Sequence, residues 1–396
     1  MYYLVLLLAG CLSLPCWASL TQLTKPELAL MQSLYQQQDR PLSSAKLNKH
    51  LLENQFLLAT ARQLNPELLV RQSSVGFDND YHIRRLMVTL LTHQFPALKS
   101  IPKKQTTVPF DTAALSDLLG TYPADGHYQT EQLTHWANIT LLEMPRITLS
   151  QLISSQSMQN RFRLHQGDTE LLTRLLNERA HYAELTDAAA PLLATQGLTL
   201  TRLETLAKGE LLRPPMLAFM GIKAQLHGER SAYLEQIRAN ISATDIQRYY
   251  KRHRDDFKYK HQLSALALRF NSQDEAKLFY KQAQRKSPLA ALKAAKRENE
   301  FAADGTAALT TITREHTHRW LAQLAFSSQP GKVTAPVRTP SGRWAIVYTE
   351  RPQYAYYPED SETVRYQALE SLTTEHAITA YQNKFKQWQQ QHGVKL

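Results

Sequence analysis

Few side chains in this sequence fall in the patterns that metal binding or catalysis requires. His316 and His318 could suggest a metal, but we expect them on one helix, where residues two apart point in different directions. No H-E-x-x-H zinc motif and no G-x-S-x-G nucleophile turn occurs. Spacing alone leaves a Ser-His-Asp triad open. We therefore predict no metal site and assign no catalytic residue from the pattern.

The two cysteines, Cys11 and Cys16, lie in an N-terminal segment that is typical of a secretory signal. It has an apolar run over 4–17, a helix-breaking proline and small residues near Ala18, so we expect a signal peptide over 1–18 with cleavage between Ala18 and Ser19. The mature chain would then contain no cysteine, which excludes disulfides and thiolate chemistry. Two alternatives remain: lipidation at Cys11, and an anchor that is retained.

Composition describes an ordinary globular protein. The 396 residues allow two or three domains, and 43% hydrophobic with 20% charged residues argues against disorder. Glycine is scarce at 13 residues, and neither the G-x-G-x-x-G nor the P-loop fingerprint occurs. We therefore expect no nucleotide cofactor and no other cofactor.

The net charge of +11 bears on possible partners. For an exported protein it favours acidic polypeptides or an anionic membrane surface, and we expect no nucleic acid. The stretch 277–297 contains lysines and arginines but no acid, which is typical of a solvated helical face and also suits an anionic surface.

Residues 20 to about 250 read as almost wholly helical. Capping boxes are predicted at Thr148, Ser242 and Thr201, each followed three residues later by Gln or an acid, and Ser43 begins a further helix. Prolines interrupt the pattern at 213–215, and the poorly patterned stretch 101–130 is predicted as a loop.

The pattern changes near residue 260. Alternation and turn residues predict strands at 263–270, 333–338 and 343–349, with helices at 272–286, 287–299 and 314–326 between the first strand and the second. This βαααββ order predicts a small antiparallel or mixed sheet with helices to one side, in an α+β domain.

A long helix closes the chain over about 360–392. Its apolar stripe must be buried, either on the preceding domain or on the N-terminal helices. The stripe consists of Ile378, Tyr381, Phe385 and Trp388.

Two segments resemble the parvulin-type prolyl isomerases. Residues 329–342, QPGKVTAPVRTPSG, are similar to that family's motif K-P-G-E-V-S-G-P-V-x-T-x-x-G, and 324–326 match the A-A-F before it. Residues 241–260, ISATDIQRYYKRHRDDFKYK, resemble the segment that precedes the domain in SurA-, PpiD- and PrsA-type extracytoplasmic folding factors. The resemblance implies a parvulin-like domain beside a helical chaperone-like body.

Departures from the family fall on its active site. The histidine of the family's first strand corresponds to Ala267, and that of its last strand corresponds to Trp344. The pocket methionine and phenylalanine correspond to Thr317 and Leu321. Without the paired imidazoles we expect weak or absent isomerase activity. Candidates for what remains of a peptide groove are Ile312, Leu321, Phe326 and Trp344.

The expected division is a signal peptide (1–18), a SurA-N-like helical region (19–257), a parvulin-like domain (258–352) and a C-terminal helix packing on the helical body (353–396). The resemblance implies a periplasmic folding factor that holds unfolded or extended polypeptides without ATP. Alternatives are an active isomerase with an altered site, and a scaffold protein of a surface or secretion system.

Overall fold

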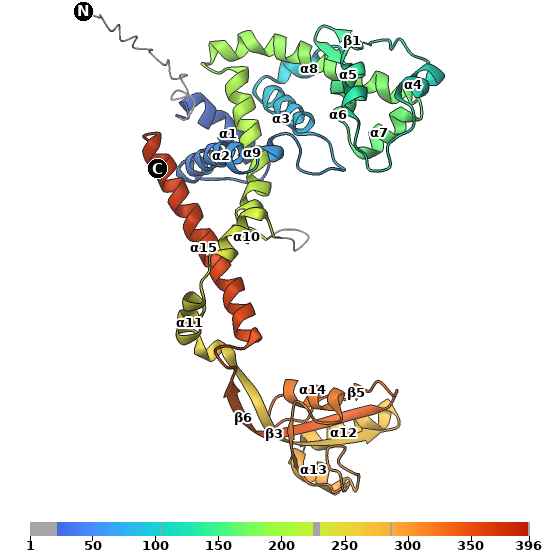
Figure 1. The fold of residues 1–396 in the computed structure, drawn as a ribbon, viewed down its shortest axis with the longest axis vertical. Coiled ribbons are helices and arrows are strands. Elements are labelled where there is room, and N and C mark those ends of the chain that lie inside the picture. The colour runs from blue at the N-terminus through green and yellow to red at the C-terminus, as the bar shows by residue number, and fades with distance from the viewer. Residues whose placement is uncertain (1–21, 104, 225–229, 286, 395–396) are drawn as a thin grey trace, which may run out of the picture. The chain divides into compact units, whose positions relative to one another are not determined.

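The computed structural model describes residues 22–394 except 104, 225–229 and 286. The chain forms two compact units, one from 1–239 with 374–396 and one from 240–373, which are described separately below (Figure 1). The expected cleavage site at Ala18 and Ser19, and Cys11, lie outside the described residues. No helix in the described part of the chain is long and apolar enough to span a membrane.

The first unit consists of helices and one hairpin. The helices carry capping residues at most starts, since Thr, Ser and Asp side chains accept the free amides of the first turn. Its elements are α1 (Lys25–Gln37), α2 (Ser44–Leu64), α3 (Asn79–Gln94), α4 (Thr112–Leu119), α5 (Thr130–Ala137), β1 (Thr140–Glu143), β2 (Arg146–Thr148), α6 (Leu149–Ser154), α7 (Met158–His165), α8 (Thr169–Thr195), α9 (Leu200–Phe219), α10 (Ala232–Ala239) and the end of α15 (Glu362–Gln391).

The predicted helix starts are confirmed in three cases out of four. Thr148 and Ser242 form capping boxes, and Ser43 caps α2. The box predicted at Thr201 is wrong, because Thr199 accepts the Arg202 amide and α9 begins at Leu200. A capping residue needs an extended backbone, and Thr199 has it.

Three other expectations for this unit need correction. Pro214 and Pro215 do not end a helix as predicted, because both lie inside α9. The stretch 101–130 contains α4, whose start is capped by Asp111. The β1–β2 hairpin interrupts the helices at 140–148, where short, partly polar strands leave little trace of alternation.

The apolar stripe of the last helix packs on the N-terminal helices, which decides between the two alternatives. Phe385 lies 5.2 Å from Phe56 of α2 between ring centroids, and Tyr381 lies 5.5 Å from the same ring. Trp388 joins this buried cluster, whereas Ile378 remains exposed.

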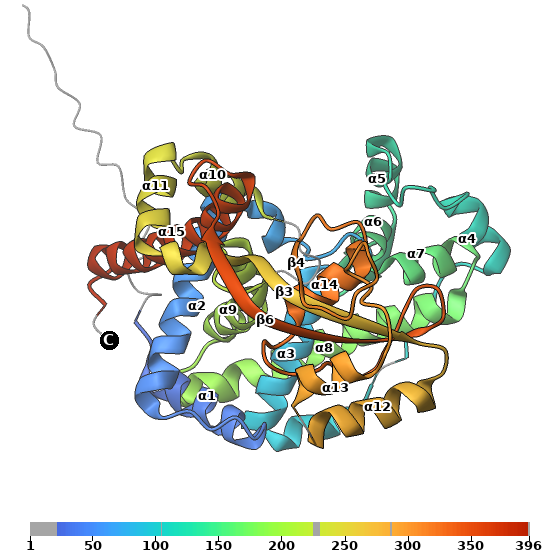
Figure 2. The same cartoon turned by 90° about the horizontal axis from the view of Figure 1, so that it is seen from below.

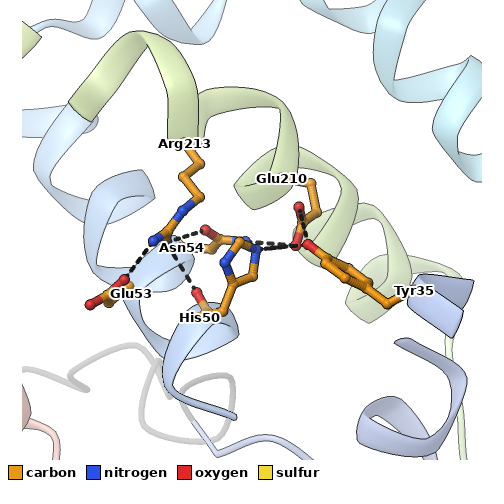
Figure 3. Close-up of polar contacts among 6 residues, drawn as sticks. All are labelled: Tyr35, His50, Glu53, Asn54, Glu210 and Arg213. Atoms are coloured by element: carbon orange, nitrogen blue, oxygen red, sulfur yellow. Dashed lines mark hydrogen bonds and ion pairs between the residues drawn. The ribbon is translucent and has the colours of Figure 1, made fainter. Parts of the chain in front are cut away.

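A polar network ties α1, α2 and α9 together (Figure 3). The Glu210 carboxylate accepts hydrogen bonds from the Tyr35 hydroxyl (2.8 Å) and the Asn54 amide (2.9 Å), and lies 2.9 Å from His50 Nε2. Burial, followed by the charge of Glu210, raises the pKa of Tyr35. A glycine precedes Glu210 because a Cβ on Gly209 would lie 2.9 Å from the Cβ of Asn54.

Arg213 extends the same network by one helical turn. Its guanidinium donates to Asn54 Oδ1 (3.0 Å) and to Glu53 Oε2 (2.6 Å). The carboxylates of Glu53 and Glu210 therefore each have a donor, and the network reads as a satisfied structural contact between helices.

The second unit contains a four-stranded antiparallel sheet of order β4-β3-β6-β5. The predicted α+β class is confirmed for the chain. The elements of this unit are α11 (Ala243–Arg252), β3 (Lys258–Phe270), α12 (Gln273–Arg285), α13 (Pro288–Ala294), β4 (Thr310–Thr313), α14 (Arg319–Ser327), β5 (Val337–Arg338), β6 (Trp344–Tyr356) and the start of α15.

Along the chain, the helices and strands of this domain follow the order βααβαββ, which corrects the predicted βαααββ. Residues 310–313 form β4, which pairs with β3, and α14 begins only at Arg319. The helix predicted over 287–299 ends at Ala294, and Lys296 follows with a φ of 51°. Helices cover both faces of the sheet, not one, because α14 packs with Ala267 whereas α12 and α13 pack with Leu268 (Figure 2).

Candidate functional site

The sheet position that corresponds to the family's first histidine is occupied by a closed apolar contact. Ala267 is fully buried on the face of β3 that α14 covers, opposite Val347 of β6. Its amide donates to Asn299 Oδ1 (2.9 Å), and its carbonyl accepts from the Glu300 amide (3.0 Å). Ala267 therefore offers neither a side-chain proton donor nor a free backbone group.

Asn299 is the polar centre of this face. Only 1% of its surface is exposed, and both ends of its amide are used. Oδ1 accepts two backbone amides and Nδ2 donates to nearby oxygens. Its partners are the amides of Ala267 (2.9 Å) and Phe301 (3.1 Å), the carbonyls of Ala308 (2.7 Å) and Ala265 (3.4 Å), and Thr310 Oγ1 (3.1 Å). A side chain with all its bonding capacity used holds loops together and leaves nothing for a ligand.

The segment after α13 brings Asn299 to the sheet through two ion pairs. Arg297 donates to the Arg269 carbonyl (2.9 Å) and pairs with Glu275. Glu300 pairs with the Arg269 guanidinium at 2.6 Å. The resemblance places the family's polar Cys, Asp or Ser position near Arg297 to Asn299 without fixing the residue, and the helix predicted over 287–299 concealed the loop that brings Asn299 to the sheet.

Three of the four groove candidates lie together in the apolar cluster beneath α14. Ile312 is 2% exposed, Leu321 is 4% exposed and Phe326 is 6% exposed. Lys260 Nζ donates to the carbonyls of Phe326 (3.0 Å) and Ser328 (2.9 Å), which satisfies the C-terminal end of α14. These three side chains form the core between α14 and the sheet.

Trp344 does not share this face. In the β3–β6 register it pairs with Phe270, three residues along from the Ala267–Val347 pair. Because side chains alternate across a strand, an odd separation moves Trp344 to the other side of the sheet. There it packs beside α12 and α13 against the cluster that contains Leu268.

The remaining positions singled out in the sequence, Thr317, His316 and His318, lie just before the start of α14. Thr317 is exposed, whereas Leu321 of α14 is buried. His316 and His318 precede α14 and do not lie on a helix as expected; their rings stack with centroids 5.8 Å apart. His316 also contacts the buried Phe301 edge-on at 5.3 Å.

Chemically, the face around Ala267 can pack against apolar groups but has no proton-transfer group at that position. In a parvulin-like site, polar groups would act on the twisting amide of a prolyl bond. Here the polar side chain bonded to Ala267 is that of Asn299, and both ends of its amide already make hydrogen bonds. The arrangement supports binding or packing and does not support general acid–base chemistry at Ala267.

A comparison with known families identifies the second unit. Residues 241–364 match the PPIC-type PPIASE domain. This match includes the helix that precedes the sheet and the beginning of α15. The expected parvulin resemblance is confirmed over these residues. No curated protein matches the chain in sequence.

Several solved structures of folding factors are similar to the chain at low identity. Foldase PrsA from Streptococcus pneumoniae is 16% identical, with 58% of this chain and 77% of that chain covered and a TM-score of 0.23. PrsA from Bacillus subtilis is 16% identical, covering 64% and 93%, with a TM-score of 0.20. A structure from the pair of SurA-like chaperones PEB4 and Cj1289 of Campylobacter jejuni is 14% identical, covering 70% and 98%, with a TM-score of 0.23. At these TM-scores the superpositions say nothing about function.

Proposed function

We propose that this chain, whose residues 241–364 form a parvulin-type domain, is an extracytoplasmic folding factor that holds unfolded or extended polypeptides without ATP and does not isomerise prolyl bonds. The match of residues 241–364 to the PPIC-type domain supports a folding factor, and the closed environment of Ala267 supports the lack of turnover. A buried methyl group and a satisfied Asn299 occupy the place where the family resemblance puts a histidine.

The barrier to prolyl isomerisation explains why this matters. Amide resonance sets it at roughly 18–20 kcal/mol, and an enzyme lowers it by interactions that strengthen as the amide twists. Ala267 has no polar side-chain group to supply such an interaction. Trp344 cannot act beside it, because the two side chains lie on opposite faces of the sheet. A domain that keeps its shape but lacks these groups is suited to contacts with chains and not to turnover.

The predicted division and export are part of the proposal. We keep 1–18 as a signal peptide, 19–257 as the helical region, 258–352 as the parvulin-like module and 353–396 as the closing helix. Cleavage before Ser19 would release the chain into the periplasm, and lipidation at Cys11 would tether it to a membrane. The mass of the mature N-terminus distinguishes these outcomes, and an uncleaved chain would contradict both.

Aggregation suppression tests the holding activity. A client enzyme unfolded in guanidinium is diluted into buffer with the full chain and no nucleotide, and light scattering is followed. We expect scattering to fall steeply near one chain per client. An unrelated protein of equal charge and concentration is the control. No protection of several unrelated clients would contradict the proposal and favour the scaffold alternative.

A further inference from the structure

Helices α3 and α8 of the first unit contact each other (Figure 1). A charged cleft is lined by residues of both helices. Its volume of about 1080 Å³ is at the upper end of the range of ligand sites. Five cationic side chains line it, against two carboxylates, Glu170 and Glu178. The cations are Arg84, Arg85, Lys103, Arg174 and Arg179.

Arg84 is the most informative of these cations. It is partly buried, yet no ion pair or hydrogen bond of its guanidinium is found within the described part of the chain. Burial, followed by the nearby Arg179, lowers the pKa of Arg84 to about 10, although Asp78 and Asp80 act in the opposite direction. The Arg84 guanidinium therefore reaches the cleft without a partner among the described residues, and a cation placed in this way can pair with an anionic ligand there.

Two further groups in the cleft wall are incompletely paired. The Nδ1 atom of His181 is buried and has no hydrogen-bond partner among the described residues. Arg179 donates to Ser155 Oγ (3.0 Å) but makes no ion pair in that same part of the chain. Asp78, the nearby acid, accepts the Tyr81 amide (2.9 Å) as the cap of α3.

The other groups that face the cleft indicate which anion fits. The exposed Glu170 and Glu178 of the lining, and Asp78 and Asp80, whose charges act on Arg84, would repel a polyanion such as a membrane surface. Beside the cations, the hydroxyls of Thr89 and Thr173 donate within their own helices and can still accept a hydrogen bond from a peptide amide. Gln105 also lines the cleft, with Val88 and Leu175 as apolar contacts.

The loop that closes one side of the cleft is anchored to α8. Asn177 Oδ1 accepts both the amide and the hydroxyl of Thr106, each at 2.7 Å. This contact holds Thr106, and with it the adjacent Gln105, beside the helix.

We propose that the α3–α8 cleft binds a carboxylate carried by an extended polypeptide segment, with Arg84 and Arg179 as the pairing cations. This inference rests on the proposed function, because it names the feature by which a held client would be recognised. The carboxylate comes from an acidic side chain or from the free C-terminus of the client.

Calorimetric titration of the full chain with matched peptides tests this site. The probe is a twelve-residue Ala/Ser/Leu peptide with central glutamates and an amidated C-terminus. Two comparison peptides contain glutamine instead, one amidated and one with a free C-terminus. We expect the glutamate peptide, the free C-terminus or both to bind about tenfold more tightly than the amidated glutamine peptide, which corresponds to about 1.4 kcal/mol.

Variants locate the binding. Arg84→Gln and Arg179→Gln are each expected to remove the preference for the carboxylate, and Arg174→Gln at the exposed rim to reduce it. Lys49→Gln, which removes one exposed charge from α2, is the matched control and should change nothing. Thermal unfolding of each variant shows that it folds; Arg174→Gln keeps the test decisive if the buried variants do not.

The outcomes are distinguishable from failure of the proposed function. If the chain suppresses aggregation but binds all peptides equally, the cleft proposal is wrong and the folding-factor proposal stands. If anionic vesicles of phosphatidylglycerol compete as well as the glutamate peptide, and lose binding in the same variants, the site is a polyanion surface and the proposal is overturned.

Discussion

The face of the sheet around Asn299 and the α3–α8 cleft treat buried polar groups in opposite ways. Asn299 uses both ends of its amide, and the backbone of Ala267 is satisfied by it. In the cleft, Arg84 has no paired carboxylate and His181 Nδ1 no partner among the described residues. The parvulin-like domain has closed the place where chemistry would occur, whereas the helical unit has left charges open to a ligand.

This difference shows that family resemblance and binding capacity can reside in different parts of one chain. Satisfied buried groups contribute to stability, whereas unpaired groups in the wall of a cleft can pair with a ligand. The comparison gives opposite expectations for substitutions in the two regions.

Asn299→Leu should have the largest effect. It leaves the amides of Ala267 and Phe301 and the Ala308 carbonyl without partners, and each unsatisfied group costs about 1–3 kcal/mol. We expect the second unit to lose about 3 kcal/mol or more in urea denaturation followed by hydrogen exchange. Asn271→Leu, at an exposed position, is the control. Equal stability of the two variants would show that the Asn299 contacts do not hold this face.

Ala267→His comes next. A ring in this filled place overpacks the core between β3 and α14, at a cost of about 1–3 kcal/mol. Isomerase activity should not appear, because Trp344 lies on the other face. Ala303→His, which is exposed, should be neutral. A gain of prolyl turnover in the Ala267 variant would mean that the rest of the active site survives.

Arg84→Met should raise the stability of the first unit, and by less than Asn299→Leu lowers that of the second. Removing a cation that has no partner relieves its desolvation, so we expect stability within about 1 kcal/mol of the unaltered chain and on the higher side. The contrast is Arg202→Met, which leaves the buried Glu27 unpaired and should be clearly destabilising. A marked loss in the Arg84 variant would contradict the open state of the cleft.

The smallest effect concerns pH. Burial alone would raise the pKa of Glu27, but hydrogen bonds from Arg202 (2.8 Å) and the Thr24 amide (2.7 Å) outweigh it and hold that pKa below its usual value. The pair therefore stabilises the first unit above the unfolded-state pKa, and this contribution is lost as the pH falls through the folded-state value. Thermal melts between pH 6 and 3 should show the loss, and Arg202→Gln should remove this part of the slope.

Local signals in the sequence predicted much of the fold. The caps at Thr148 and Ser242 and the stripe around Phe385 were readable because they rest on fixed spacings. The strand 310–313 was not, since four residues with three threonines give no clear period. Pro214 and Pro215 were misread as a helix end because the local preference of proline is outweighed by the burial of their neighbours Leu212, Met216 and Leu217 in α9.

The candidate site was less predictable for a geometric reason. Aligning the sequence with the family matches Ala267 and Trp344 to the two family histidines. The face of the sheet that each side chain occupies, however, depends on the strand register. That register also passes through irregularities near Lys260 and Gln262. The role of Asn299 depends on a loop fold that brings distant backbone groups to one amide, and no spacing in the sequence encodes it.

Refolding of a client whose slow phase is limited by a prolyl bond tests the central claim most directly. The uncatalysed phase takes about 10–100 s at 25 °C, and both its rate and the final yield can be followed in one experiment. With the full chain present, we predict a higher yield of folded client and an unchanged rate of the slow phase. An acceleration of that phase in proportion to the chain's concentration would contradict the account.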